Sequence, residues 1–204
     1  NDKLRGFYRS TYKDERGTAH SLAATQFEAT DARRAFPCWD EPGFKAVFAT
    51  TLVIDPTLTA VSNSSVVTET LAAGKKVVRF ADTIKMSTYL VAFIVGRIEP
   101  TEPVMVGQTP LRLWAIPGKK HLTSFGQDIA AASLSFFESY YGIPYPGDKL
   151  DLLAIPDFAS GAMENLGAIT YRETALLVDR QGATHVDLAR VADVVAHENA
   201  HMWF

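Results

Sequence analysis

Five consecutive residues near the C-terminus, His197-Glu198-Asn199-Ala200-His201, carry the clearest chemical signal of the chain. Residues four apart on a helix project from one face, so a helix here would place the imidazoles of His197 and His201 side by side. Two neutral imidazole nitrogens in that arrangement suit two corners of a tetrahedral zinc ion. Glu198 would flank the ion and could accept a proton from zinc-activated water, then pass it to a leaving amine. The alternative is an ordinary helix with two surface histidines and a glutamate.

The segment from Thr184 onward has the start and the periodicity that such a helix needs. Thr184 and Asp187 form an imperfect version of the capping box, a hydroxyl followed three residues later by a carboxylate. Helical spacing gathers one apolar stripe, which consists of Leu188, Val191, Ala192, Val195 and Met202. Asn199 falls within this stripe, so its amide must find hydrogen-bond partners.

The zinc site that these residues predict lacks a ligand. A catalytic zinc takes three protein ligands and keeps a fourth position for water, and no earlier residue has an obvious claim to be the third ligand. We therefore expect that ligand beyond Phe204 and expect the chain to be a fragment.

Composition excludes several other classes of protein. The chain has 204 residues, 47% hydrophobic content and a net charge of −3, without a basic patch for nucleic acid. Its longest apolar run, Tyr89 to Val95, is too short to cross a bilayer. The single cysteine, Cys38, allows no internal disulfide, which fits a cytoplasmic protein.

The two halves of the chain differ in amino-acid composition and pattern. Residues 1–98 are rich in β-branched and aromatic segments separated by turn residues, which predicts mostly antiparallel strands at Phe44–Ile54, Lys76–Phe80 and Ile84–Val95. Prolines and glycines between Gly96 and Gly107 indicate a domain boundary. The second half predicts a helix over Ser124–Tyr141 and extended segments at Leu111–Ile116, Asp151–Ile155, Gly167–Tyr171 and Leu176–Val178.

The segment Ser160-Gly161-Ala162-Met163-Glu164-Asn165 lies between two of those predicted strands. Small residues at Gly161 and Ala162 allow another backbone to approach, so an edge strand here could accept an extended peptide. Glu164, at its end, could pair with a cation. The alternative is a tight turn with an exposed glutamate.

Together, GAMEN at 161–165 and HENAH at 197–201 resemble the paired signatures of the M1 family of zinc aminopeptidases, the gluzincins. The surrounding PDFASGAMENLGAITYRE, the earlier TQFEATDARRAFPCWDEP and the Trp-Phe after the second histidine resemble the family too. The resemblance implies a mixed α+β fold. Residues 1–98 would be the later part of an antiparallel β N-terminal domain, and residues 99–204 the truncated start of a thermolysin-like catalytic domain.

The resemblance also implies a role for each matching residue. His197 and His201 would bind one catalytic Zn²⁺, and Glu198 would be the general base. Glu164, together with Glu28 of TQFE, would hold the free α-amino group of a peptide substrate. From composition alone, Glu28 is a solvated charge in a polar loop.

Further substrate contacts are implied around the GAMEN segment. Gly161, Ala162 and Met163 would contact the peptide, the first two through their backbone. Ser160 and Phe158 would line the pocket for its first side chain.

Two departures from the family pattern, Asn199 for leucine and Met202 for glutamine, concern helix packing more than chemistry. Without the family's downstream ligand, the chain alone should be inactive and should bind zinc weakly. We expect its parent to release N-terminal residues from peptides. A zinc hydrolase of a non-peptide substrate, such as an epoxide, and a non-catalytic binding or scaffold protein are the alternatives.

Overall fold

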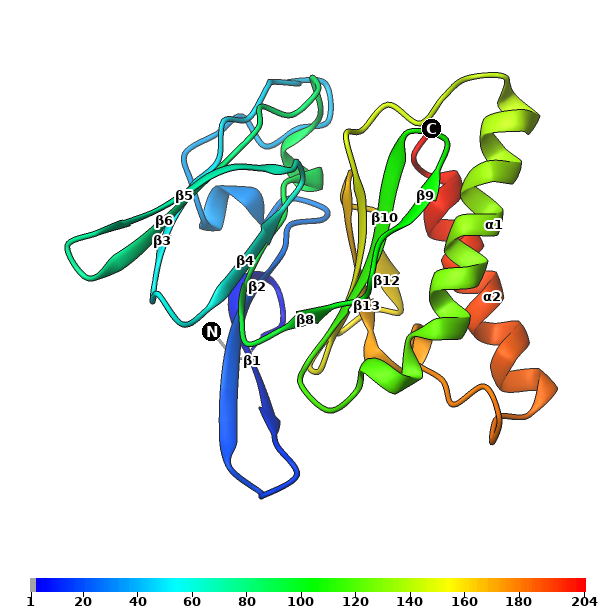
Figure 1. Cartoon of the computed structure of the whole chain (residues 1–204). Coiled ribbons are helices and arrows are strands. Elements are labelled where there is room, and N and C mark those ends of the chain that lie inside the picture. The colour runs from blue at the N-terminus through cyan, green and yellow to red at the C-terminus, as the bar shows by residue number, and fades with distance from the viewer. Residues whose placement is uncertain (1–2) are drawn as a thin grey trace.

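The computed structural model describes residues 3–204 and confirms the mixed α+β class. Its layers are visible in Figure 1. The N-terminal strands lie on one side, the six-stranded sheet stands in the middle, and the helices α1 and α2 run side by side over the other face of that sheet.

Two antiparallel sheets form the N-terminal half, as the sequence predicted. The first has the strand order β1 (Gly6–Lys13), β2 (Ala19–Gln26), β7 (Phe93–Gly96) and β4 (Thr59–Ser62). The second has the order β3 (Thr51–Ile54), β6 (Lys75–Phe80) and β5 (Val66–Ala72). Short 3-10 turns at Ala32–Arg34 and Thr88–Leu90 interrupt the loops between them.

The third sheet carries the second half of the chain. Its strand order is β12 (Ala162–Met163), β13 (Ala168–Arg172), β11 (Leu150–Ile155), β10 (Thr109–Ala115) and β8 (Glu99–Pro100), with β9 (Val104–Val106) also paired to β10. The pairs β10–β11 and β11–β13 are parallel, while β12 is an antiparallel edge strand. Short 3-10 turns occur at Lys120–Leu122 and Glu173–Ala175.

The helices are α1 (Ser124–Tyr141) and α2 (His185–Ala200). The first has the predicted bounds and ends at Gly142, whose left-handed φ of 64° suits a residue without a side chain. The crossover from β10 through α1 to β11 is the helical connection that parallel neighbours require.

The central strand β11 is buried at every position because both faces of its sheet are covered. Leu150 and Leu152 contribute to the core beneath the helices, whereas Leu153 and Ile155 belong to the core shared with the N-terminal strands. The sheet is therefore packed on one face against the helices and on the other face against the N-terminal strands.

Two polar side chains fasten the halves together. Asn63 donates to the carbonyls of Leu90 and Leu166, both at 2.8 Å. The Nζ of buried Lys149 lies 2.6 Å from the carbonyls of Ser62 and Gly167.

Gly167 allows this close approach of the two halves. Its φ is +74°, and a Cβ there would lie 2.0 Å from the carbonyl oxygen of Asn63. A side chain is therefore excluded at this point of contact.

Three predicted strands are wrong in extent or kind. Within Phe44–Ile54 only Thr51–Ile54 forms a strand, and within Ile84–Val95 only the end from Phe93 does; a single bridge joins Ala46 to Met86. Leu176–Val178 forms no strand, because its apolar residues pack into the core beneath α2 instead of pairing. The domain boundary near Ile98 stays a prediction.

Within residues 3–204, none of the helices has the length and apolar character needed to cross a membrane.

Candidate active site

The helix α2 begins as predicted, with Thr184 as its N-cap and a complete capping box. The backbone N–H of Asp187 donates to the hydroxyl of Thr184 at 3.3 Å, and the backbone N–H of Thr184 donates to the Asp187 carboxylate at 3.1 Å. The apolar face of the helix packs under α1, with Val191, Val195 and Met202 buried. These contacts fix the rotation of α2 and therefore the direction of its histidines.

Asn199 lies within that buried face, as predicted, and is 0% exposed. Its side-chain amide donates to the carbonyl of Ala130 at 2.9 Å and to the hydroxyl of Ser133 at 2.8 Å, both on α1. The amide nitrogen thus has the partners that its position requires, whereas the amide oxygen is buried without a hydrogen-bond partner among the described residues.

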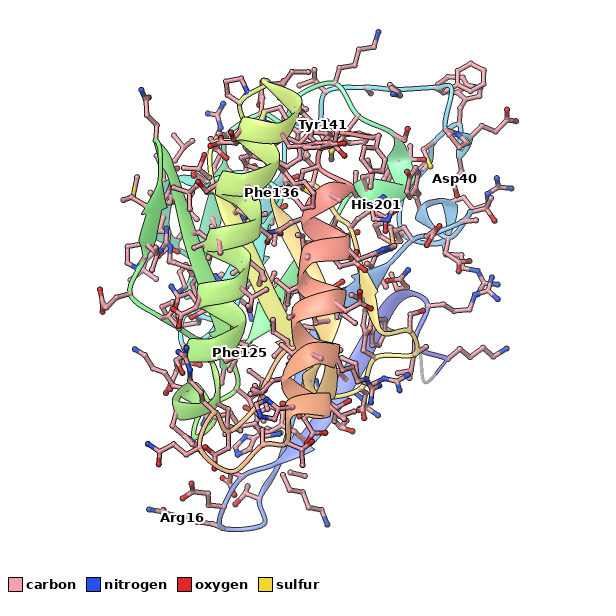
Figure 2. All side chains as sticks on the ribbon, turned by 90° about the vertical axis from the view of Figure 1, so that its right-hand side faces the viewer. Arg16, Asp40, Phe125, Phe136, Tyr141 and His201 are labelled. Atoms are coloured by element: carbon pink, nitrogen blue, oxygen red, sulfur yellow. The ribbon has the colours of Figure 1, made fainter. Side chains whose placement is uncertain are left out.

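His197 and His201 project together from the end of α2, on the side that faces away from α1; Figure 2 labels His201 there. Their Nε2 atoms are 3.1 Å apart and their ring centroids 4.8 Å apart. The predicted convergence of the two imidazoles is therefore present in the structure.

This pair suits a zinc ion. Zinc–nitrogen bonds of about 2.0–2.1 Å place two nitrogen ligands of a tetrahedral ion about 3.3 Å apart, which is close to the observed distance between the two Nε2 atoms. Neutral imidazoles are ordinary zinc ligands. Among residues 3–204, no group of three or more His, Cys, Asp or Glu is arranged to hold a metal ion. The described residues thus supply a pair of ligands.

Glu198 lies between the two histidines in the sequence and is buried, with 6% of its surface exposed. Its Oε2 is buried without a hydrogen-bond partner among the described residues. Burial raises the pKa of Glu198 to about 7, and repulsion from Glu164 and Glu28 adds to the shift. A carboxyl group that titrates near neutral pH is suited to accept and return a proton.

Glu164 follows β12, at the open edge of the six-stranded sheet. The amide of Arg172 donates to the carbonyl of Gly161 at 2.9 Å, which fixes the alternation of this antiparallel pair. By that alternation, Ala162 directs its own N–H and C=O outward. A Cβ added at Gly161 would meet no protein atom within 4 Å, so the space beside it is open to an incoming backbone.

Glu28 comes from the other half of the molecule, two residues beyond β2, and faces the same space. The pKa of Glu28 is raised, and the largest cause is the loss of hydration on burial. Repulsion from Glu164 also raises this pKa, whereas the charge of His201 lowers it. Neither Glu28 nor Glu164 forms an ion pair or a hydrogen bond within the described residues. Two carboxylates that repel each other and form no ion pair within the described residues suit a cation from outside.

Sequence reasoning missed two tyrosines at this site. Half-buried Tyr89 has a raised pKa, caused by burial and then by the charges of Glu164 and Glu28, so its hydroxyl lies near both carboxylates. Tyr171 of β13 is fully buried, and burial together with the charge of Glu198 raises its pKa well above the usual value. Neither residue belongs to a spacing pattern that could have revealed it.

The remaining predicted contact residues differ in where their side chains lie. Ser160 is exposed at the rim of the site, and its role stays a prediction. Met163 and Phe158 have side chains buried in the core between the two halves, with 1% and 5% exposed. The side chain of Met163 is therefore not accessible to a peptide, and its predicted contact stays a prediction.

Comparisons with known proteins show the family of the chain. The description "Peptidase M1 N-terminal domain" matches residues 1–90, and "Peptidase family M1 domain" matches residues 125–204. The whole chain is 50% identical to part of the puromycin-sensitive aminopeptidase of Caenorhabditis elegans and covers 22% of that protein. It is also 50% identical to part of aminopeptidase 2, mitochondrial, of Saccharomyces cerevisiae, and 49% identical to part of aminopeptidase M1-B of Oryza sativa.

In each of these three proteins the matched part is about a fifth of the whole length, at 22%, 21% and 23%. All of this chain takes part in each match, and the two family descriptions follow one another along it. The chain belongs to the M1 peptidase family.

Proposed function

We propose that the whole protein carrying this chain is a zinc aminopeptidase that removes the N-terminal residue from peptides. One observation carries the proposal most directly. Glu28 and Glu164, from different halves of the molecule, face one space and form no ion pair within the described residues, beside the paired His197 and His201. The relatives named aminopeptidases support the same reading.

The two carboxylates would select the substrate. A free peptide N-terminus is an ammonium group at neutral pH, and charge-assisted hydrogen bonds to Glu28 and Glu164 would anchor it. The bound ammonium would also relieve the repulsion that raises the pKa of Glu28. An internal peptide bond offers no such cation, so binding of the ammonium group by the two carboxylates would direct hydrolysis to the first peptide bond.

The open edge at β12 would hold the peptide extended. Ala162 can pair its N–H and C=O with the substrate backbone, and the open space beside Gly161 gives that backbone room. With the amine fixed at one end and the backbone along the edge strand, the first carbonyl has one position available to it.

Glu198 would move the proton. Its carboxylate, with a pKa near 7, accepts a proton from the attacking water and returns it to the departing amine. His197 and His201 would hold a zinc ion, which supplies Lewis-acid polarisation of the scissile carbonyl when bound. The 204-residue chain alone is expected to lack turnover, because it offers a pair of ligands.

Replacing Glu198 by Gln in the whole protein tests this assignment. The variant should retain zinc, measured by elemental analysis, and should lose nearly all turnover of an amino-acid amide with a chromogenic leaving group. Asp193→Asn, five residues earlier at an exposed position of α2, is the matched control and should keep wild-type turnover. Substantial turnover by the Glu198 variant would remove this residue from the mechanism.

A further inference from the structure

A second site lies on the face of the six-stranded sheet that is turned away from the helices. It is a cavity of about 310 Å³ between that sheet and the N-terminal strands. Arg112 and Trp114 of β10 form its floor together with Asp151 of the neighbouring strand β11 and Lys149, which directly precedes that strand. None of the candidate active-site residues lines it.

Three polar atoms of this floor are buried without a hydrogen-bond partner within residues 3–204. They are Arg112 Nε, Trp114 Nε1 and Asp151 Oδ1. Trp114 is 9% exposed and Asp151 3% exposed, so bulk water does not solvate them freely. Unpaired buried polar atoms are uncommon because each has lost its hydration without compensation, and three around one cavity indicate a missing partner.

Lys149 does not provide that partner. The three hydrogens of its ammonium group are directed to the carbonyls of Ser62 and Gly167, at 2.6 Å each, and to Asp151 Oδ2 at 2.8 Å. The charge of Asp151 is thereby balanced, while its Oδ1 stays free to accept a hydrogen bond. The side chain of Arg112 forms neither an ion pair nor a hydrogen bond with the part of the chain that the structure describes.

The spacing of the free groups defines the ligand. Arg112 and Asp151 are register partners on adjacent parallel strands, about 4.8 Å apart, and Trp114 follows Arg112 on the same face after about 6.6 Å. Two donors thus lie beside one acceptor within the span of a small molecule. The opposite wall includes the apolar side chains of Val66 and Phe80.

We propose that this cavity binds a free α-amino acid with an apolar side chain. Its carboxylate accepts from Arg112 and Trp114, its ammonium donates to Asp151 Oδ1, and its side chain lies toward Val66 and Phe80. A molecule with both charges matches a floor that offers both donors and an acceptor, whereas an anion or an amine alone satisfies one part of it. The volume is at the lower end of the range for small-molecule sites.

The indole N–H of Trp114 gives a local readout of binding. The chain has three tryptophans, so a ¹⁵N-labelled sample has three indole resonances, and Trp114→Phe identifies the relevant one. Titration with leucine should shift this resonance saturably. Isocaproate, which lacks the amine, and isoamylamine, which lacks the carboxylate, should each bind at least about tenfold more weakly, since each loses one set of charge-assisted hydrogen bonds.

Matched variants locate the effect. Arg112→Gln should weaken leucine binding at least about tenfold, whereas Arg16→Gln, at the turn between β1 and β2 that Figure 2 labels, should leave it unchanged. Glu164→Gln should also leave it unchanged, which separates this cavity from the candidate active site. No leucine-dependent shift, an equal shift in Arg112→Gln, or an analogue that binds as tightly as leucine would overturn the proposal.

Discussion

Lys149 fastens the two halves of the molecule, and its replacement by methionine tests how the site is held together. The side chains of Lys149 and Asp151 are 4% and 5% exposed, and the lysine also bonds to carbonyls of Ser62 and Gly167, one from each half. Methionine has a similar volume and none of these donors. The change therefore leaves Asp151 as a buried charge without its cation, in addition to two unpaired carbonyls.

The expected loss of stability is large. Removing one partner of a buried ion pair costs about 3–5 kcal/mol, because the other charge stays buried without compensation. Removing both charges restores much of that loss, so Lys149→Met with Asp151→Leu should be more stable than Lys149→Met alone. For a chain of this size each kcal/mol corresponds to about 2–4 °C in Tm, so the single variant should melt at least about 6 °C lower.

Lys119→Met is the matched control. Its Nζ lies 2.5 Å from the carboxylate of Glu173, but the lysine side chain is 38% exposed, so solvent screens the pair. Its loss should cost about 1 kcal/mol or less. Urea unfolding followed by circular dichroism measures both variants. An equal loss in the two, or a double variant less stable than Lys149→Met, would refute the buried-pair reasoning.

Three further predictions concern α2. Thr184→Ala removes the N-cap and should cost about 1 kcal/mol of unfolding free energy in urea titrations; an unchanged midpoint would contradict the capping box. The hydrogen bonds from Thr184 lower the pKa of Asp187, so this carboxylate should add stability above about pH 4 that is lost as pH falls further, and the Thr184 variant should lack that acid-dependent loss. Asn199→Asp places a carboxylate against the carbonyl of Ala130 and should destabilise strongly at pH 7 and less at pH 4, as melting temperatures would show; equal destabilisation at both values would contradict its burial as a charge.

The helices could be predicted because their signals are local. The end of α1 at Gly142 and the cap of α2 at Thr184 are decided by a few neighbouring residues. The strands depended on distant partners. Phe44–Ile54 has strand composition, yet most of it finds no neighbour to pair with, and the β1–β2 hairpin was not predicted because its small and polar residues give a weak pattern.

The site shows the same division between local and distant information. The pairing of His197 with His201 follows from helical spacing alone, and the structure shows it. The approach of Glu28 to Glu164 spans the whole fold, so only the family resemblance indicated it. Tyr89 joins them through the loop that Asn63 fastens, a contact that no sequence pattern encodes.

The central claim is that Glu28 and Glu164 anchor the substrate ammonium. The most direct measurement is kcat/KM of the whole protein for a peptide with a free N-terminus and for the same peptide N-acetylated, in the wild type and in Glu28→Gln. Acetylation should cost at least about 100-fold in the wild type, because a bond misplaced by about 1 Å can lose that much. The ratio between the two peptides should be clearly smaller in Glu28→Gln. Equal rates on the two peptides, or a ratio unchanged by the substitution, would contradict it.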